Sequence, residues 1–517
     1  MKTTDDFFDD VTLSLADIAG RPYCEAVCAA RAALSGENAG KLRRLAEQRV
    51  AFFPRVLQRR LRALLPRVGE AVAAPWQGSP AGATTAAFAA ASHPDLAPLS
   101  GLGCFRIGED GRLRLAAKSE HYHASLGHAF PGYRLLEHAR RLGIPNATHN
   151  NTRGAITRRL EEELVRAAHG LAPDDAAGLA RVRASRDPRL VNRVLNLETG
   201  SLAAEAALKM VLARFHRVQD DSPPPPHAGR VPVILVMGND QGGLQANYHG
   251  TTILTQALRG MWPDLHRHLE ARQAWKVVPL RPNRLDDLEQ AFAAYERPPY
   301  KVAGFLHEIV MMNYGGRVLT REFLQRAYAL CQAHDAATVV DEIQSCMWYP
   351  GYFLFREYGL QPTFVALGKG FPGGEYPASR LLLSAAYDSL SQFGALVTNG
   401  QEELASLAYL ITMRWARANA GRTRQVGAEY ESRLRGLAAR HAGAVRAVHG
   451  IGHLAGLEFA DVARARRFAA ALTGRGIDIS VQTYKADCPP VALTKLPLIA
   501  DRAIVDFVVA RMEEALS

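Results

Sequence analysis

Short apolar segments rich in β-branched residues alternate with helical patterns through the middle of the chain, and this alternation constrains the fold more than any other feature. Residues 285–295 and 321–334 have the spacing of amphipathic helices and lie between such segments. Strands that alternate with helices are typical of a doubly wound α/β sheet whose strands are mostly parallel. The predicted strands are Val231–Met237, Lys276–Leu280, Val302–Leu306, Ala337–Val340, Phe364–Leu367 and Leu381–Leu383.

Changes in composition along the 517 residues predict two domains and an extension. Residues 1–95 are rich in Ala and Arg at helical spacing and end in a looser stretch with Pro and Gly, so we predict a helical N-terminal extension. We expect residues 166–400 to form the large domain that contains the sheet. Residues 96–165 and 401–517 are expected to be the two parts of a small α+β domain.

The charge balance suits anionic small ligands and does not require a nucleic-acid partner. The chain has 62 Lys and Arg against 51 Asp and Glu, a formal net charge of +11. The densest basic run, 41–67, carries apolar residues at helical spacing, which is typical of an amphipathic helix with a solvated basic face. We therefore predict no nucleic-acid partner, and a regulator that binds DNA through this run is kept as a third alternative.

Cysteine usage and the lack of long apolar runs predict a cytoplasmic protein. The chain has six cysteines, of which only Cys24 and Cys28 lie close together, so no zinc site and no other metal is expected. Scattered cysteines fit a reducing compartment. No run of 18 apolar residues predicts a membrane span, and the acidic N-terminus is not typical of a secretory signal.

A carboxylate stands at the end of one predicted strand. Asp341 closes the apolar segment Ala-Thr-Val-Val-Asp. In open α/β sheets, ligands collect at the carboxyl ends of the strands, and a carboxylate there can pair with a cationic ring nitrogen. Taken alone, Asp341 is explained equally well as the cap of a following helix.

A lysine follows the next predicted strand in a glycine-rich turn, Gly-Lys369-Gly-Phe-Pro-Gly-Gly. Burial and a nearby cation would lower the pKa of such an amine and make it a nucleophile for Schiff-base chemistry. Taken alone, Lys369 is more simply a surface lysine. Together, Lys369 and Asp341 match what pyridoxal phosphate (PLP) requires, an amine for its aldehyde and an acid that keeps its pyridine nitrogen protonated.

A third segment has the character of a phosphate site. Gly200 and Ser201 open an Ala-rich helical pattern. The N-terminus of a helix carries free N–H groups that bind phosphate, whereas a plain serine cap is the simpler explanation of one such motif.

These motifs resemble those of the class III aminotransferases, PLP enzymes of fold type I that include ornithine, acetylornithine and 4-aminobutyrate aminotransferases. The resemblance covers residues 100–517, and the motifs follow one another in the order found in the family. The matching segments are Ser125–His128, Thr199–Ala206, Tyr248–Gly250, Glu308, Asp341–Gln344, Gly368–Gly370 and Thr398.

The resemblance implies how this chain would bind the PLP ring. It implies that Lys369 forms the Schiff base, that Asp341 pairs with the pyridine nitrogen and that Gln344 meets the ring hydroxyl. The aromatic-His-Gly motif, which contains Tyr248 and His249, is implied to stack on the ring.

The resemblance also implies how the phosphate is held and that the site is shared between two subunits. Gly200 and Ser201 are implied to bind the phosphate, and Thr398 to reach it from the neighbouring subunit of a homodimer. Glu308 is similar to the active-site glutamate of the family.

Departures from the family pattern affect the recognition of the substrate carboxylate. Many relatives have an arginine in the segment that matches Ser345–Gly351, where this chain has none. Near the C-terminus, where the family often has an arginine that grips the carboxylate, the nearest cation is Lys495, a point charge and not a bidentate fork. Arg153 is a candidate replacement, with a surface arginine at a helix start as its alternative. Tyr122 and His123 are candidate residues of the substrate pocket.

The leading hypothesis is a PLP-dependent aminotransferase that moves an amino group between an amino acid or amine and a 2-oxo acid. The same fold and the same lysine also serve racemases, epimerases, aminomutases and decarboxylases, so these reactions are the second alternative. A PLP-sensing regulator without turnover is the third.

Overall fold

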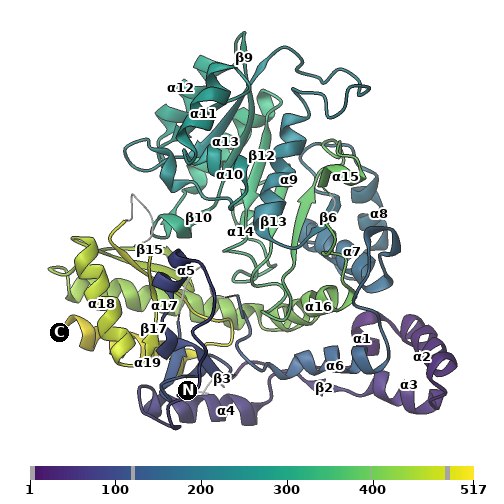
Figure 1. Cartoon of the computed structure of the whole chain (residues 1–517), viewed down its shortest axis with the longest axis vertical. Helices are drawn as coiled ribbons and strands as arrows, with labels where there is room; N and C mark the ends of the chain where they lie inside the picture. Colours follow the sequence, from purple (N-terminus) through teal and green to yellow (C-terminus); the bar gives the residue numbers. More distant parts are fainter. Residues whose placement is uncertain (1–5, 118–122, 396, 484–488) are drawn as a thin grey trace.

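The computed structural model describes residues 6–117, 123–395, 397–483 and 489–517. Its largest element is a seven-stranded sheet with the order β6-β14-β13-β12-β9-β7-β8 (Figure 1). β14 is antiparallel to both of its neighbours, and every other neighbouring pair is parallel. The strands are β6 (Arg193–Leu197), β7 (Val231–Met237), β8 (Lys276–Leu280), β9 (Tyr300–His307), β12 (Ala337–Asp341), β13 (Phe364–Leu367) and β14 (Ser379–Leu383).

The sheet is buried on both faces, which explains why its strands are continuous apolar runs. In β7, Val233 and Leu235 belong to one hydrophobic cluster, whereas Ile234 and Val236 belong to the other. Successive side chains of a strand point to opposite faces, so each face of the sheet carries its own row of apolar side chains. The first cluster includes residues of helices α12 (Leu285–Tyr295) and α13 (Arg321–Ala333), and the second includes residues of α9 (Gly200–Leu212). The predicted fold class, a mostly parallel doubly wound α/β sheet, is confirmed.

All six predicted strands are present, and the structure adds β6. The sequence pattern of β6 is weak because three of its five residues are only half-buried and because it contains the polar Asn196. β6 pairs with β14 at the edge of the sheet. A strand at an edge needs less apolar character than one in the centre.

Two smaller four-stranded sheets join segments that are far apart in the sequence. β5 (Leu113–Ala116) runs parallel to β17 (Ile477–Asp478), so residues that precede the large sheet share a sheet with the C-terminal part of the chain. Arg106 forms an ion pair with Asp478 across the same sheet. The remaining strands of these two sheets are β3 (Pro98–Leu102), β4 (Phe105–Gly108), β15 (Val445–Ile451), β16 (Leu454–Phe459), β18 (Ser480–Val481) and β19 (Val491–Lys495).

The other helices and short strands surround these sheets (Figure 1). The helices are α6 (Arg134–Arg141), α7 (Ala155–His169), α8 (Ala176–Ala184), α10 (Ile253–Leu258), α11 (Pro263–Ala271), α14 (Leu354–Glu357), α15 (Gln392–Ala395), α16 (Glu403–Ala418), α17 (Ala420–Arg440), α18 (Val462–Gly474) and α19 (Arg502–Leu516). The short antiparallel pairs are β1 (Thr12–Leu13) with β2 (Val50–Ala51), and β10 (Val310–Met311) with β11 (Arg317–Val318).

The N-terminal segment is helical, and it packs against the rest of the molecule. Phe8 and Phe53 are buried, and their rings lie 5.3 and 6.1 Å from the ring of Trp415 on α16. This aromatic contact anchors the segment to a helix that is itself almost fully buried. The helices of the segment are α1 (Leu15–Ala19), α2 (Arg21–Ser35), α3 (Ala39–Glu47) and α4 (Arg55–Leu64).

The basic run 41–67 forms two helices and not the single helix that its spacing predicts. Strand β2 separates α3 from α4, and Pro54 lies at the start of α4. Proline has no N–H to continue a helix but is tolerated at a helix start, so the chain turns here. Arg62 from this run forms an ion pair of 2.5 Å with Asp501, which uses part of the basic face within the molecule.

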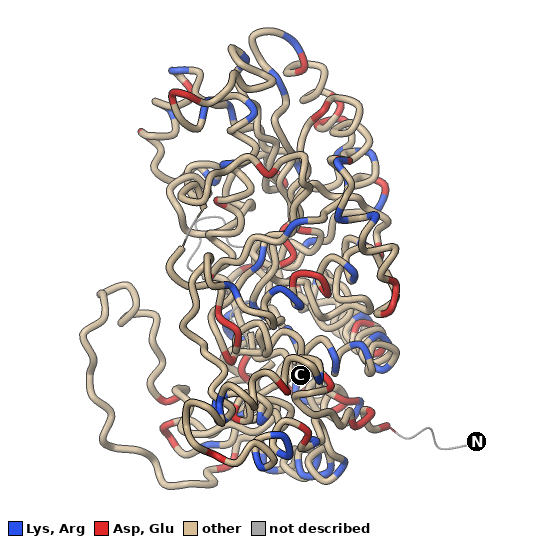
Figure 2. The backbone as a smooth tube through the Cα atoms, turned by 90° about the vertical axis from the view of Figure 1, so that its right-hand side faces the viewer, with Lys and Arg blue, Asp and Glu red and all other residues tan. Residues whose placement is uncertain are grey.

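The stretch that follows the N-terminal helices stands away from the body. Helix α5 (Ala86–Ala91) has no buried residue, and Trp76 and Phe88 are exposed. Figure 2 shows this stretch as a long uncharged loop at one side of the molecule.

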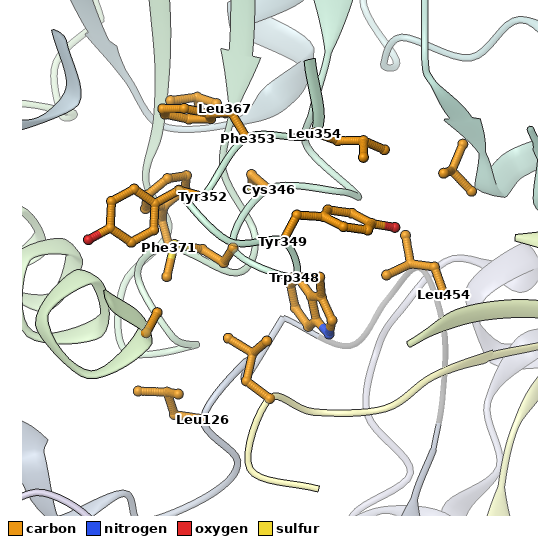
Figure 3. Packing of buried hydrophobic residues seen from close by; sticks show 14 of the residues in the cluster. Leu126, Cys346, Trp348, Tyr349, Tyr352, Phe353, Leu354, Leu367, Phe371 and Leu454 are labelled. Carbon is orange, nitrogen blue, oxygen red and sulfur yellow. The ribbon is translucent and has the colours of Figure 1, made fainter. Parts of the chain in front are cut away.

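An aromatic cluster supports the loop that follows β12. Trp348, Tyr349, Tyr352 and Phe353 come from this loop and are buried together with Phe371 (Figure 3). The ring of Phe353 lies 5.9 Å from that of Phe371, which follows β13. The segment where this chain departs from the family pattern is therefore a packed part of the core that links the ends of β12 and β13.

No helix in the described part of the chain combines the length and the apolar character that a membrane span needs.

Candidate active site

A cavity of about 320 Å³ lies at the carboxyl ends of the parallel strands. It is lined by residues that directly follow β6, β9, β12 and β13, because the ends of neighbouring parallel strands meet at one edge of a sheet. The lining residues are His123, Glu198, Thr199, Gly200, Ser201, Tyr248, His249, Gly250, Glu308, Asn313, Asp341, Ile343, Gln344, Lys369, Pro372, Tyr376, Pro377, Ala378 and Ser379.

Asp341 is the last residue of β12, and its carboxylate is held from two sides. It is buried, and its Oδ2 lies 3.0 Å from Nδ1 of His249. Its Oδ1 accepts a hydrogen bond of 3.0 Å from the backbone N–H of Ile343. These contacts fix the carboxylate at the edge of the cavity.

Glu342, the next residue, is fully buried behind the cavity wall. Its carboxylate accepts hydrogen bonds from the Ser345 hydroxyl and from the backbone N–H groups of Leu354 and Phe355. Burial raises the pKa of Glu342 to about 7, the charge of Asp341 adds to this, and the three hydrogen bonds oppose it. Glu342 thus ties the loop after β12 to α14 and does not face the cavity.

Lys369 lies two residues beyond the end of β13 in a strained backbone conformation. Its φ is +34°, which is uncommon for a residue with a Cβ and is typical of functional sites. The glycines on either side are needed for packing. A Cβ on Gly368 would lie 2.5 Å from Oγ of Ser379, and one on Gly370 would lie 2.5 Å from the ring of Trp348. The turn therefore brings the lysine backbone close to the cavity wall.

The N-terminus of helix α9 forms another wall. Thr199 caps the helix through its hydroxyl, which accepts from the N–H of Leu202. Gly200 and Ser201 follow at the first turn and line the cavity. Gly250 packs against this turn so closely that a Cβ there would lie 2.6 Å from Cα of Ser201. The hydroxyl of Ser201 accepts a hydrogen bond of 3.1 Å from the N–H of Thr251.

Tyr248 and His249 precede that glycine and face the cavity from the loop after β7. The guanidinium of Arg259 lies 5.3 Å from the centroid of the Tyr248 ring. His249 is buried, and within the described residues its Nε2 has no hydrogen-bond partner. A buried imidazole nitrogen of this kind marks a place for a ligand or a water molecule.

Gln344 lines the cavity and also contacts Lys495, which lies behind it. Lys495 is fully buried at the end of β19, and its Nζ donates a hydrogen bond of 3.2 Å to Oε1 of Gln344. Glu308 follows β9, is buried and accepts a hydrogen bond of 3.2 Å from the N–H of Met312. His123 also lines the cavity but is exposed.

The structure does not bring all the predicted site residues to this cavity. Arg153 forms an ion pair of 3.2 Å with Glu161 and lines a separate surface depression beside α7 and α8. Thr398 is exposed and does not line the cavity of its own chain. Tyr122 lies outside the described residues.

Several residues that line the cavity are not predicted from the sequence. Glu198 directly follows β6 at the same edge as Asp341 and Lys369, so its position after a strand was a usable signal once β6 was known. Asn313 and Tyr376 lie in loops, and no local pattern places them at the cavity. Within the described ranges, no cluster of three or more His, Cys, Asp or Glu side chains could hold a metal ion.

Known sequences are similar to this chain over parts of their length. A taurine–pyruvate aminotransferase of Rhodobacter capsulatus is 26% identical over 323 residues, which are 58% of this chain and 65% of the relative. An ornithine aminotransferase of Saccharomyces cerevisiae is 28% identical over 277 residues, which are 50% of this chain and 61% of the relative. Each alignment thus spans less than two thirds of the curated relative.

Solved structures show the same fold. An ornithine aminotransferase from Toxoplasma gondii has a TM-score of 0.64 at 20% identity, and the match covers 81% of this chain and 90% of that one. An N-acetylornithine aminotransferase from Stenotrophomonas maltophilia has a TM-score of 0.59 at 20% identity and covers 83% and 98%. These likenesses confirm the prediction of PLP fold type I.

The family model of the class-III aminotransferases matches residues 94–516, which include every residue that lines the cavity. The predicted resemblance is confirmed, and the chain belongs to the aminotransferase class-III family.

Proposed function

We propose that this chain is a PLP-dependent aminotransferase that moves an amino group from an amino acid or amine to a 2-oxo acid. The observation that carries the proposal is the placement of Lys369 and Asp341 in one cavity, at the ends of adjacent parallel strands and beside the N-terminus of α9. An amine, an acid and a phosphate site in one cavity match the three groups of PLP that a protein must bind.

The residues present fit PLP, the cofactor of the class-III family. The first turn of α9 offers backbone N–H groups for the phosphate, and Gly200 lets this turn pack against the Ile343 side chain, which a Cβ would approach to 2.8 Å. Asp341 is a fixed carboxylate for the pyridine nitrogen. Tyr248 offers an aromatic ring that would cover the ring plane. When bound, PLP supplies an electron sink for the carbon that loses its proton.

The side chains of this chain would then divide the remaining work. Lys369 would bind the cofactor through Nζ and, once the substrate amine replaces it, carry a proton at the same atom as general acid and base. Asp341 would keep the proton on the ring nitrogen, and Gln344 would contact the ring hydroxyl. Glu308 lies at the cavity as a buried carboxylate that can orient the substrate.

We also propose a homodimer that works in the cytoplasm. Thr398 is exposed and away from the cavity of its own chain, which supports a role at the phosphate of a second subunit. The described cysteines at 24, 28, 104, 331 and 346 are free and buried, which fits a reducing compartment.

Single additions of amines and amino acids to the PLP-loaded protein, without any 2-oxo acid, test the proposed reaction. We expect one class of donor to bleach the visible absorption of the cofactor and to leave one equivalent of pyridoxamine phosphate per site. A 2-oxo acid added afterwards should restore the absorption. A racemase, aminomutase or decarboxylase would instead consume substrate while the absorption returns without a 2-oxo acid.

Gly250→Ala is expected to weaken PLP binding. The new methyl group would lie 2.6 Å from Cα of Ser201, and the φ of +125° disfavours any residue with a Cβ. We expect a stability loss of about 1–3 kcal/mol and at least about a tenfold rise in the dissociation constant of PLP. Thermal unfolding and PLP titration of the apoprotein measure the two effects.

Gly229→Ala is the matched control for this prediction. Gly229 also has a positive φ of +79°, but a Cβ there would meet no atom within 4 Å. Gly229→Ala should introduce backbone strain, and so lower stability, without changing the affinity for PLP. Equal PLP affinity in the Gly250→Ala protein and the wild type would contradict a phosphate site at the start of α9.

A further inference from the structure

A surface depression of about 1200 Å³ lies at the amino-terminal end of β6. Arg193 and Val194 of this strand line the depression. Glu198 and Thr199, just beyond the other end of the strand, line the cavity that contains Lys369. The depression and the cavity therefore lie toward opposite edges of the large sheet, and a ligand in the depression would not occupy the cavity.

Two parts of the chain build this depression. Helices α7 and α8 form much of its wall, and Ala19 and Tyr23 of the N-terminal segment complete it. Figure 1 shows α7 and α8 at the right of the molecule, with α1 and α2 below them. Gly20, between α1 and α2, comes so close to α7 that a Cβ there would lie 2.8 Å from the guanidinium of Arg159. Because the N-terminal segment precedes residues 94–516, the family match does not account for this depression.

Three glutamates line the depression, and each already has an arginine as its partner. Glu161 forms an ion pair of 3.2 Å with Arg153. Glu162 forms an ion pair of 2.9 Å with Arg183. Glu163 pairs with two arginines of α16, which do not line the depression. The acidic side chains of the depression are thus neutralised by these partners.

Four further arginines line the depression, and none of them forms an ion pair with an acidic side chain in the described ranges. Arg158, Arg159 and Arg166 lie on α7, at spacings of seven and eight residues that place them on one face of the helix. Arg193 lies at the start of β6, and its guanidinium donates to the backbone carbonyl of Arg183. The wall of the depression therefore carries positive charge that the protein itself does not balance.

The charge and the shape of this wall indicate the chemistry of a ligand. Like charges on a concave surface repel one another, and a wall of low dielectric focuses their field on an incoming anion. The guanidinium group matches the oxygens of a phosphate as a planar fork with two parallel hydrogen bonds. Several such groups on one wall suit a chain of phosphates better than a single carboxylate. Tyr23, which is half-buried in the same wall, adds an aromatic side chain beside them.

We propose that this depression binds a small molecule with a chain of two or more phosphate groups, which the guanidinium groups of Arg158, Arg159, Arg166 and Arg193 contact. Inorganic polyphosphate and nucleoside polyphosphates both carry such a chain, and in a nucleotide the base would pack against Tyr23. The site does not depend on the reaction in the cavity. Its ligand would bind together with the substrate and not in competition with it.

Calorimetric titration of the full chain, saturated with PLP, with inorganic triphosphate and separately with ATP tests this proposal. Saturation with PLP keeps the proposed phosphate site of α9 occupied, so the added phosphates report on other sites. We expect one ligand per chain at low ionic strength and weaker binding as salt is added. The double variant Arg158→Met, Arg159→Met should raise the dissociation constant at least about tenfold, because it removes hydrogen bonds to a charged acceptor.

Two further variants separate a built site from net charge and from folding. Arg466→Met with Arg467→Met removes the same charge from exposed positions of α18, which does not line the depression, and should leave the dissociation constant unchanged. Ala180→Glu places a carboxylate on the wall at an exposed position of α8 that a glutamate fits well, because both residues favour helices. This variant should weaken binding by repulsion, and it keeps the test decisive if the arginine variant does not fold.

The absence of saturable binding at low salt would overturn the proposal. So would equal weakening by the α7 and the α18 double variants, because the ligand would then respond only to net charge. Tighter binding of ATP than of triphosphate, lost in Tyr23→Ala, would support the proposal with a nucleotide as ligand. Equal affinity for the two probes, sensitive to Arg158 and Arg159, would support it with the phosphate chain alone. A chain that does not bind PLP can be titrated in the same way, so failure of the proposed function leaves this test intact.

Discussion

Lys369→Ala is expected to reduce kcat of transamination by about 10⁴-fold and to abolish the visible absorption that PLP acquires in this site. Lys369 is the one candidate that both binds the aldehyde and moves the proton, so its loss removes two functions at once. Lys369 follows β13 and lies between glycines that allow close packing against Ser379 and Trp348. No other described lysine lines the cavity. Steady-state kinetics and an absorption spectrum at saturating PLP give both values.

Two controls separate chemistry from folding in this experiment. Lys276→Ala removes a half-buried lysine from β8, which does not line the cavity, and should leave kcat unchanged. The Lys369→Ala protein should also remain folded, because alanine has a Cβ as lysine does, so the positive φ at this position strains both residues to a similar extent. Activity within tenfold of the wild type would exclude Lys369 as the cofactor lysine.

Asp341→Asn is expected to reduce kcat by about 10²–10³-fold while PLP remains bound. The amide has the same shape as the carboxylate, but it carries no negative charge and cannot keep a proton on the ring nitrogen. The contacts of Asp341 with His249 and with the N–H of Ile343 hold the side chain in one orientation, so the substitution tests charge more than position. Single-turnover rates with the best donor measure the loss directly.

His249→Phe and Asp335→Asn are the comparison variants for this second prediction. His249→Phe removes one hydrogen bond to Asp341 and should cost only about tenfold in kcat. Asp335 precedes the other end of β12 and pairs with Arg214, so Asp335→Asn should leave kcat unchanged. If Asp341→Asn and His249→Phe cost the same, the carboxylate would matter only as a hydrogen-bond partner, and its proposed role toward the ring nitrogen would be wrong.

Local patterns in the sequence were sufficient for six of the seven strands of the large sheet. A strand that is buried on both faces needs an apolar residue at every position, so β7 and β13 are visible as continuous apolar runs. β6 is not recognisable as an apolar run, because it lies at the edge of the sheet and is only half-buried along most of its length. Pro54 in the basic run is a sequence signal for a helix start, yet the apolar spacing on either side of it predicted one continuous helix.

The position of each polar residue directly after a predicted strand was likewise sufficient to predict that Asp341 and Lys369 lie close together. Both residues follow buried strands, and parallel neighbours end at the same edge, so the sequence implies one site for the two side chains. The matched family model spans residues 94–516 and so includes both side chains. The roles of the individual residues stay predictions that the substitutions above test.

The sequence by itself thus determined the fold class, the family and the strand ends from which the chemistry is built. Only the tertiary structure decided that Lys495 is buried against Gln344 and Trp348, that Arg153 pairs with Glu161 away from the cavity, and that Glu198 faces it. The physical reason is that periodicity along a chain reports which residues are buried, whereas the partner of a charged side chain depends on segments that folding brings together from distant positions.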